Sequence, residues 1–458
     1  MNPNPPQPAR FHAELAWLGG AAPVADVLIE TAGGVITALA PGSGRPRDAV
    51  SLTGLTVPGL VNTHSHVFHR AIRGHSPSGV ADFWAWRDLM YDVAARLDPE
   101  LLYELARATY VEMALSGITS VGEFHYLHHD RDGSRYDDPN VMGATLIRAA
   151  NDAGIRITLL DTCYLQGSAD GAPLEGVQLR FTDRSWSAWA DRVAQLSGGP
   201  MSRVGTAIHS IRAVPRESLR PIAEYAATRG LPLHVHLSEQ PAENTACHRA
   251  YGLTPAELLS AEGVLGPATT AVHATHLTDH DIELLGGSAT SISMCCTTER
   301  DLADGVGPAV RLSRTGSPLC VGSDAHMAID LWEEARAIEL DERLVSGHRG
   351  HLQAPELLAA LTSAGADAVG WNAGRIEPGR LADLVTVRLD SPRTAGARCG
   401  DVLAHVLFAA TGADVSTVVV AGRTVVEGGS HVTAPEPGRD LERAIAPALG
   451  VPDGDGGL

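Results

Sequence analysis

The sequence predicts an α/β protein built as a (β/α)8 TIM-like barrel with a small β-sandwich domain. Two observations carry this prediction. Short apolar, β-branched segments alternate with helix-like segments through the middle of the chain, and short β-rich segments flank that region on both sides. Alternating strands and helices are typical of a parallel sheet, and eight such units close into a barrel. A chain of 458 residues is long enough for both parts.

The eight expected barrel strands are short and bounded by helix-like or turn-rich sequence. They are 55–64, 119–126, 155–164, 203–210, 232–237, 269–277, 288–295 and 318–324. The flanking segments, 11–57 and roughly 376–430, are each too small to build a sandwich alone, so we expect the two to pair. The sequence therefore predicts a small β domain over 1–57 plus 376–458 and a barrel domain over 58–375.

Composition limits the classes of function. The formal net charge is -19, which disfavours binding to nucleic acid or to an anionic membrane. The chain shows no secretory signal pattern and no apolar run long enough to cross a bilayer. Six cysteines without a CxxC pair favour a thiol-rich protein over a disulfide framework. We expect a cytoplasmic protein that acts on a small-molecule substrate.

Candidate metal ligands stand at the ends of the expected strands. The first strand ends in NTHSH, and the period of two in a strand lets His64 and His66 point the same way. His236, His273 and Asp324 occupy the corresponding places in later strands. The carboxyl ends of barrel strands meet at one mouth, and imidazole and carboxylate groups suit a divalent ion such as zinc. An HxH pair alone is a weak signal, but the joint pattern predicts a metal site.

These motifs resemble the amidohydrolase superfamily. HSH at 64–66, HVHLSE at 234–239, AVHATHL at 271–277 and GSDAH at 322–326 carry the resemblance, which covers nearly the whole chain. It implies that the metal ligands are His64, His66, His236 and Asp324, with His273 nearby. Many members bind two metals bridged by a carbamylated lysine, and this chain contains no lysine. We therefore expect one divalent metal per chain, zinc or alternatively iron(II), and a homodimer as a family-level expectation.

The residue after the third ligand motif points to the reaction. Glu239 follows His236 by three residues, a pattern that resembles the deaminases of the superfamily, in which the glutamate carries protons. A bound metal lowers the pKa of its water to about 7, and a proton acceptor is then needed. Asp324 can help to deprotonate the water, and His273 can donate to the developing tetrahedral centre. The alternative is that Glu239 is a solvated carboxylate at the start of a loop.

Segments outside the metal motifs resemble, more narrowly, the formimidoylglutamate deiminases. These segments are DFWAWRDLMY at 82–91, EFHYLHHD at 123–130, HSIRAV at 209–214 and TTERDLADG at 297–305. The resemblance implies conversion of N-formimino-L-glutamate to N-formyl-L-glutamate and ammonia in histidine degradation, with Tyr126, His209 and Arg212 contacting the substrate. Arginine pairs bidentately with carboxylates, so Arg87 and Arg212 are candidates for binding the substrate's carboxylates. Alternatively, Arg87 lies on a helix surface and Tyr126 packs at the barrel rim.

The sequence also departs from that narrower family. His69 stands where the family usually has a substrate-contacting glutamine, and MCCTTERDLADG lacks the proline and the asparagine-leucine-glycine run expected there. A second hypothesis is therefore a related deaminase for another amidine, a guanidine or an amino-heterocycle, which His69 favours. A third is a non-catalytic metal-binding relative. Glu239 argues against the third, because a binding protein needs no proton carrier.

Overall fold

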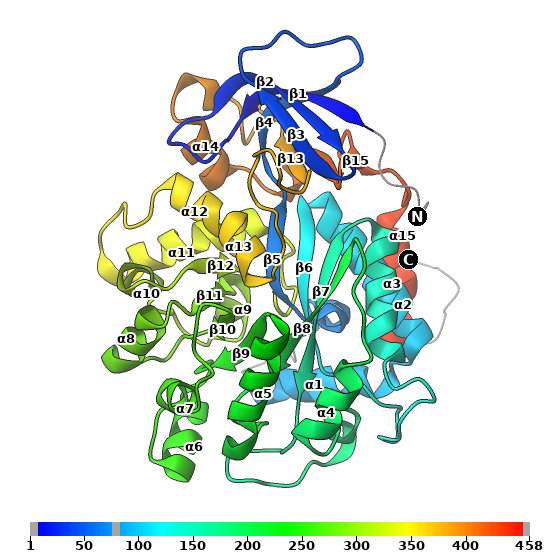
Figure 1. Ribbon diagram of the computed structural model, residues 1–458, viewed down its shortest axis with the longest axis vertical. Helices are drawn as coiled ribbons and strands as arrows, with labels where there is room; N and C mark the ends of the chain where they lie inside the picture. Colours follow the sequence, from blue (N-terminus) through cyan, green and yellow to red (C-terminus); the bar gives the residue numbers. More distant parts are fainter. Residues whose placement is uncertain (1–7, 76–82, 452–458) are drawn as a thin grey trace.

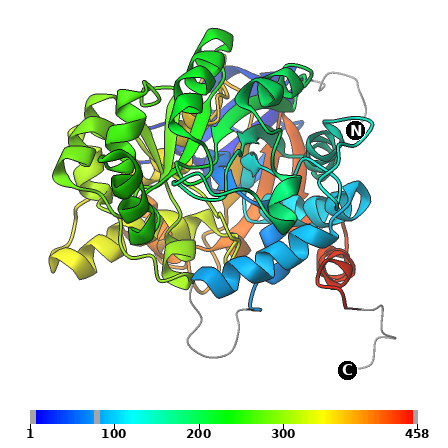
Figure 2. The same ribbon diagram turned by 90° about the horizontal axis from the view of Figure 1, so that it is seen from below.

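The computed structural model describes residues 8–75 and 83–451, and within them the chain forms two sheets of eight strands each. The barrel sheet is parallel and runs in the order β12-β11-β10-β9-β8-β7-β6-β5. The second sheet, built from the two ends of the chain, lies above the barrel in Figure 1. Seen from below in Figure 2, helices surround the central strands. The predicted fold class is confirmed.

The barrel strands overlap all eight segments predicted from the sequence. They are β5 (Leu60–Ser65), β6 (Ile118–His125), β7 (Arg156–Cys163), β8 (Ser202–Ile208), β9 (Leu233–Leu237), β10 (Thr269–His273), β11 (Ser291–Met294) and β12 (Leu319–Val321). Every residue of β5, β6, β7 and β9 is buried, as expected for parallel strands that are covered on both faces.

The barrel closes where β12 returns to β5. Ser65 and Asp324 form an isolated parallel bridge, and the Asp324 N–H donates to the His64 carbonyl at 3.0 Å. Asn62 and Ser323, 261 residues apart in the chain, exchange two hydrogen bonds of 2.7 and 2.9 Å. The first and last strands are therefore joined by both backbone and side-chain contacts near the mouth.

The helices alternate with these strands and form the outer layer. They are α1 (Phe83–Arg96), α2 (Pro99–Leu115), α3 (Val141–Ala153), α4 (Trp186–Val193), α5 (Arg216–Arg229), α6 (Pro241–Tyr251), α7 (Pro255–Ala261), α8 (Asp279–Gly287), α9 (Cys296–Asp301), α10 (Ala309–Thr315), α11 (Leu331–Ser346), α12 (Ala354–Leu361) and α13 (Ser363–Ala368). Local sequence sets several ends. Asp98 accepts a hydrogen bond from the Leu101 N–H and caps α2, and Asp330 caps α11 in the same way.

The terminal sheet runs in the order β16-β15-β14-β13-β4-β1-β2-β3. A bridge between Val35 and Leu381 brings β3 back toward β13, so the sheet folds over a core that includes Phe11, Ile29 and Val419. Its strands are β1 (Ala9–Ala16), β2 (Val24–Ala32), β3 (Val35–Ala40), β4 (Val50–Pro58), β13 (Leu384–Val387), β14 (Val415–Val420), β15 (Arg423–Glu427) and β16 (Ser430–His431). The two ends of the chain pair as predicted.

Two helices from the C-terminal part of the chain contact the barrel layer. The helix α14 (Val402–Ala409) packs against α11 and α12, and α15 (Pro437–Ala448), red in Figure 1, packs against α2. Residues beyond 376 thus contribute to both the sheet and the barrel surface. The boundaries at 57/58 and 375/376 stay a prediction.

One predicted strand, 55–64, divides in the structure at Gly59. A Cβ on Gly59 would lie 2.1 Å from Thr119 Oγ1, so the chain passes β6 too closely for a larger residue. Its N–H donates to the Asp383 carbonyl at 2.8 Å. Residues before Gly59 belong to β4 of the terminal sheet, and residues after it belong to β5 of the barrel.

A buried ion pair joins the barrel to the terminal sheet at the end opposite the mouth. Arg156, the first residue of β7, donates from Nε to Asp383 Oδ2 at 2.8 Å and from Nη1 to the Pro200 carbonyl at 2.8 Å. Asp383 Oδ1 also accepts from the Ala421 N–H at 2.7 Å, and the Trp371 ring lies 5.1 Å from the guanidinium. Both partners of the pair are therefore fully hydrogen-bonded.

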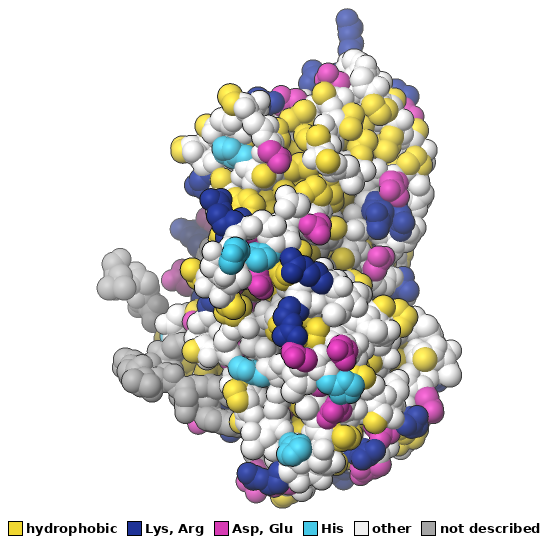
Figure 3. Space-filling view, turned by 90° about the vertical axis from the view of Figure 1, so that its left-hand side faces the viewer, with side chains coloured by type: hydrophobic (Ala, Val, Ile, Leu, Met, Phe, Trp, Pro, Cys, Tyr) yellow, Lys and Arg dark blue, Asp and Glu magenta, His cyan; other side chains and the backbone are white. Residues whose placement is uncertain are grey.

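Surface charges of opposite sign alternate on the face shown in Figure 3, where arginine side chains lie beside acidic ones. Among the ion pairs of the described residues, Arg300 contacts Glu333 at 2.9 Å and Asp341 at 2.8 Å. Among residues 8–75 and 83–451, no helix combines the length and apolar character that crossing a membrane requires.

Candidate active site

The four predicted metal ligands come together at the barrel mouth. His64 Nε2 lies 3.1 Å from His236 Nε2 and 3.2 Å from Asp324 Oδ1. His66 Nε2 lies 3.4 Å from His236 Nε2 and 3.5 Å from Asp324 Oδ1. These residues come from the ends of β5, β9 and β12, so the barrel brings together ligands that are far apart in the sequence.

The hydrogen bonds on the opposite ring nitrogens decide how two of these imidazoles are protonated. His66 Nδ1 donates to the Phe124 carbonyl at 3.0 Å, and His236 Nδ1 donates to the His209 carbonyl at 2.8 Å. A carbonyl only accepts, so the proton is on Nδ1 and each Nε2 presents a lone pair. Burial lowers the pKa of His66 to about 3 and that of His64 and His236 well below the ordinary value. The rings are neutral, as metal ligands must be.

The separations fit a small divalent ion. The Nε2 lone pairs of His66 and His236 face each other at 3.4 Å, and Asp324 Oδ1 lies 3.5 Å from His66 Nε2, so these groups repel unless a cation lies between them. Ligand atoms on a tetrahedron with bonds of about 2.1 Å are about 3.4 Å apart. The chain has no lysine to form a carbamate bridge, so the donor set suits one ion.

Strained backbone turns these side chains into the mouth. Five of the ten non-glycine residues with positive φ in the described ranges stand at the end of β10 or just after β9, β10 and β12: Ser238, His273, Ala274, Asp324 and His326. Asp324 has a φ of 40° and His273 one of 69°, in the left-handed region that such residues rarely adopt. Strain of this kind persists where the surrounding fold enforces it and is concentrated at functional sites.

Glu239 lies between the ligand cluster and a cation. Its Oε1 is 3.9 Å from His273 Nε2, and its Oε2 accepts from Arg212 Nη2 at 3.0 Å. His273 also lies 3.9 Å from Asp324 Oδ2 and 3.5 Å from Glu299 Oε1. Burial lowers the pKa of His273, but the charge of Glu239 and the hydrogen bond to Glu299 outweigh burial and raise it to about 10. Surrounded by carboxylates, His273 is a charged hydrogen-bond donor.

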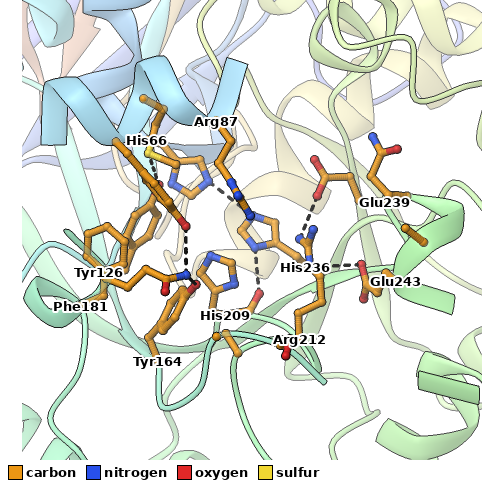
Figure 4. A pocket seen from close by; sticks show the side chains of 18 of the residues that line it. His66, Arg87, Tyr126, Tyr164, Phe181, His209, Arg212, His236, Glu239 and Glu243 are labelled. Carbon is orange, nitrogen blue, oxygen red and sulfur yellow. Dashed lines mark hydrogen bonds and ion pairs between the residues drawn. The ribbon is translucent and has the colours of Figure 1, made fainter. Parts of the chain in front are cut away.

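A cavity of about 350 Å³ adjoins this cluster. All five residues predicted to contact substrate line it: His69, Arg87, Tyr126, His209 and Arg212. In Figure 4 the aromatic rings of Tyr126, Tyr164 and Phe181 lie on one side, and Glu239 and Glu243 lie on the other. The cavity therefore has an aromatic wall and an acidic wall, with the candidate metal ligands between them.

The aromatic wall holds several polar groups in neutral form. Tyr126 is buried, and its hydroxyl lies 3.1 Å from His69 Nε2. Burial lowers the pKa of His69 and of His209 well below the ordinary value. The His209 ring packs edge-on against Tyr164 at 4.6 Å. His69, Tyr126 and His209 can therefore hydrogen-bond a ligand without adding charge.

The two predicted carboxylate-binding arginines enter the cavity from different elements. Arg87 extends from α1, and its guanidinium lies 5.3 Å from the Tyr91 ring (Figure 4). Arg212 follows β8 and lies near Glu243 as well as Glu239, with its Nε 3.7 Å from Glu243 Oε2. Of the segment DFWAWRDLMY that predicted Arg87, Asp82 lies outside the described residues.

Sequence reasoning missed three buried acids around the site. Glu243 lies on α6, four residues after Glu239. Asp304, in the loop after α9, accepts a hydrogen bond from Gln240 Nε2, and burial together with Glu239 raises its pKa to about 8. Glu123 accepts from Ser65 Oγ at 2.6 Å, and burial raises its pKa to about 8. A lone acid in a helix, strand or loop gives no local signal of a site.

The family follows from a comparison with known proteins. A model of the Amidohydrolase family matches residues 55–425. The chain belongs to this family. Among curated relatives of this amidohydrolase, formimidoylglutamate deiminase from Pseudomonas aeruginosa is 34% identical over 88% of this chain and 91% of its own. The 8-oxoguanine deaminase of the same organism is 30% identical over 86% and 85%.

A solved structure is also similar to this amidohydrolase. The crystal structure of an amidohydrolase from Brucella melitensis superposes with a TM-score of 0.88 and 31% identity, covering 96% of this chain and 100% of the other. The resemblance inferred from the sequence motifs is therefore confirmed at the level of the family. The roles of individual residues stay predictions.

Proposed function

We propose that this amidohydrolase is a metal-dependent deaminase that hydrolyses N-formimino-L-glutamate to N-formyl-L-glutamate and ammonia, a step of histidine degradation. The observation that carries the proposal is the position of Glu239. It lies at the same time beside the ligand cluster and beside Arg212, so a proton carrier and a carboxylate-binding cation share one cavity. The 34% identity to a formimidoylglutamate deiminase over most of both chains supports the same substrate.

In this proposal His64, His66, His236 and Asp324 hold one divalent ion, zinc or alternatively iron(II). The ion supplies Lewis-acid chemistry, which lowers the pKa of a water molecule to about 7. Glu239 accepts the proton that this water loses and passes it to the nitrogen that leaves. The water oxygen would bond to the amidine carbon, Glu239 would carry the two protons of the water in turn to the terminal imino nitrogen, and the bond to that nitrogen would break to leave a formyl group and ammonia.

His273 and its neighbours stabilise charge and bind the substrate; they do not transfer protons. Its ring is charged and lies 3.9 Å from both Glu239 Oε1 and Asp324 Oδ2, so it can stabilise negative charge that develops at the reacting carbon. Glu299, at 3.5 Å from Nδ1, holds the ring in this orientation. The substrate's carboxylates would bind Arg212 and Arg87, while Tyr126 and His209 hydrogen-bond its neutral part.

A related deaminase acting on another amidine, a guanidine or an amino-heterocycle is the second candidate. The aromatic wall suits a planar ring, because Trp86, Tyr91 and Phe181 add to Tyr126 and Tyr164 in lining the cavity. His69 supplies a hydrogen bond to Tyr126 that a glutamine would supply with a different reach. The similarity to 8-oxoguanine deaminase, at 30% identity, supports this candidate.

The decisive test is to incubate the zinc-loaded protein with N-formimino-L-glutamate and to measure ammonia and N-formyl-L-glutamate. Equal amounts of the two products, absent with Glu239→Gln at unchanged zinc content, are expected. Formamide in place of ammonia would mean that the other C–N bond is cut and would refute the proposal. Turnover of an amino-heterocycle without turnover of N-formimino-L-glutamate would establish the second candidate.

A further inference from the structure

Arg212 lies between two carboxylates that differ in their access to the cavity. Glu239 Oε2 is 3.0 Å from its Nη2, and Glu243 Oε2 is 3.7 Å from its Nε. The side chain of Glu243 is fully buried, and its Oε1 accepts from the Ser238 N–H at 3.3 Å. The side chain of Glu239 is 9% exposed and lines the cavity. Glu243 is therefore the fixed partner of Arg212 and Glu239 the accessible one.

The ion pair with Arg212 engages Glu239, which is the proposed proton carrier. One carboxylate oxygen of Glu239 accepts a charged hydrogen bond, and the other is 3.9 Å from His273 Nε2, beyond hydrogen-bond distance. The charges of Glu239 and Glu243 outweigh burial and raise the pKa of Arg212. In this arrangement Glu239 is stabilised as the counter-ion of a cation at the substrate-binding side.

We propose that a carboxylate of the substrate replaces Glu239 at Arg212, and that this exchange frees Glu239 to accept the proton of the attacking water. The proposal rests on the proposed deaminase function and names its substrate class: molecules with a hydrolysable C=N group at one end and a carboxylate at the other. Arg212 thus couples recognition of the anionic end to the chemistry at the other end.

Electrostatics favours the exchange. Glu239, 3.0 Å from Arg212, already neutralises the guanidinium, so a carboxylate of the substrate meets no net positive charge there unless Glu239 leaves. Glu243 cannot leave, because it is buried and held by the Ser238 N–H. Glu239 can turn toward His273, whose Nε2 lies 3.9 Å from its Oε1. A neutral amidine lacks the carboxylate and leaves Glu239 paired with Arg212.

A binding experiment on the zinc-loaded protein tests the exchange without turnover. Calorimetry gives the Kd of glutarate, an unreactive dicarboxylate, with glutaramide as the neutral control. Glu239→Gln should tighten glutarate binding by about tenfold, because the competitor for Arg212 loses its charge. Glu262→Gln, which removes a half-buried partner of Arg216 at 2.8 Å outside the cavity, should leave the Kd unchanged.

A double-mutant cycle shows whether the gain in glutarate affinity comes from Arg212 or from the metal. If the gain depends on Arg212, it disappears when Arg212→Gln is added to Glu239→Gln. Should Arg212→Gln fold poorly because Glu243 loses its partner, Arg212→Gln/Glu243→Gln replaces it in the cycle. The same tenfold gain with and without Arg212, or no gain in either background, would overturn the proposal.

A kinetic experiment tests the release of Glu239. Glutarate should accelerate hydrolysis of N-ethylformamidine by about fivefold in a saturable manner, and Arg212→Gln should abolish the acceleration. Turnover of N-formimino-L-glutamate in the same preparation tests the proposed function separately. Turnover without acceleration or coupling means that the exchange is wrong and the function right. Coupling in the binding cycle without turnover of N-formimino-L-glutamate means that the exchange is right and the proposed function is wrong.

Discussion

The two ends of the barrel differ in how well their buried polar groups are satisfied by hydrogen bonds. At the end next to the terminal sheet, Arg156 and Asp383 satisfy each other, and the Pro200 carbonyl and the Ala421 N–H complete their hydrogen bonds. At the mouth, the Nε2 lone pairs of His66 and His236 face each other at 3.4 Å. The first arrangement is stable as it stands, and the second is stable only with a cation in it.

Because of this difference, we expect one end of the barrel to contribute to stability and the mouth to contribute to function. A buried polar group that is fully hydrogen-bonded costs little to keep, whereas an incomplete one is destabilising unless a ligand completes it. The strained backbone at His273 and Asp324 belongs to the incomplete end. We therefore expect substitutions at the mouth to change turnover, and substitutions at the opposite end to change the free energy of unfolding.

The largest expected effect is on the mouth side. Glu239→Gln removes the proton carrier without removing a metal ligand, so kcat should fall by about 10² to 10⁴. Zinc content and the midpoint of urea unfolding should stay at the wild-type values. Steady-state kinetics together with metal analysis measure both, and a loss of zinc equal to the loss of kcat would make Glu239 a ligand instead.

Arg156→Met should give the converse result. It leaves Asp383 as an uncompensated buried carboxylate, which should lower the free energy of unfolding by about 3 to 5 kcal/mol. Urea denaturation measures the loss, and kcat of the folded fraction should not change. Arg156→Met/Asp383→Leu, which removes both charges, serves as the control and should recover much of the stability. A fall in kcat that persists in the folded double variant would contradict the separation of the two ends.

Arg212→Gln should act on substrate use within the mouth. For N-formimino-L-glutamate, kcat/KM should fall by about 10²-fold, because a charge-paired contact to the substrate is lost. For N-ethylformamidine, kcat/KM should not fall, because that substrate has no carboxylate. Arg87→Gln measured in parallel shows how much of the anionic contact comes from α1. An equal loss on both substrates would mean that Arg212 has a structural role.

The smallest effect is expected at His69. His69→Gln changes the group that hydrogen-bonds Tyr126, and should alter the ratio of kcat/KM between N-formimino-L-glutamate and an amino-heterocycle by about tenfold. Neither zinc content nor unfolding should respond, because His69 is outside the ligand set. An unchanged ratio would show that the aromatic wall alone sets substrate preference.

The barrel and the convergence of the four candidate metal ligands could be predicted from the sequence because both follow simple rules of strand geometry. Side chains alternate along a strand, so HSH at the end of β5 places two imidazoles on one side. Parallel strands of a barrel bring their carboxyl ends together, so His236 and Asp324 join them. These inferences required no knowledge of packing between elements.

Features that depend on packing between elements could not be predicted. The division of the first strand at Gly59 comes from its close approach to Thr119, 60 positions further along the chain. Glu243 and Asp304 are ordinary acids in their own segments, and they belong to the site because α6 and the loop after α9 fold over the mouth. The packing of α15 on α2 likewise depends on residues far apart in sequence.

The closure of the barrel links the ion to the mechanics of the whole chain. Asn62 and Ser323 fasten the first and last strands beside the residues proposed to bind metal, and the Asp324 N–H is hydrogen-bonded to His64 across the same seam. An ion bound there crosslinks the closed barrel, because it ties together strands separated by 261 residues of chain. Without the ion, local opening of the barrel should start between its first and last strands. Amide hydrogen exchange at His66 and Asp324 should therefore slow as the ion binds, before any other part of the barrel responds.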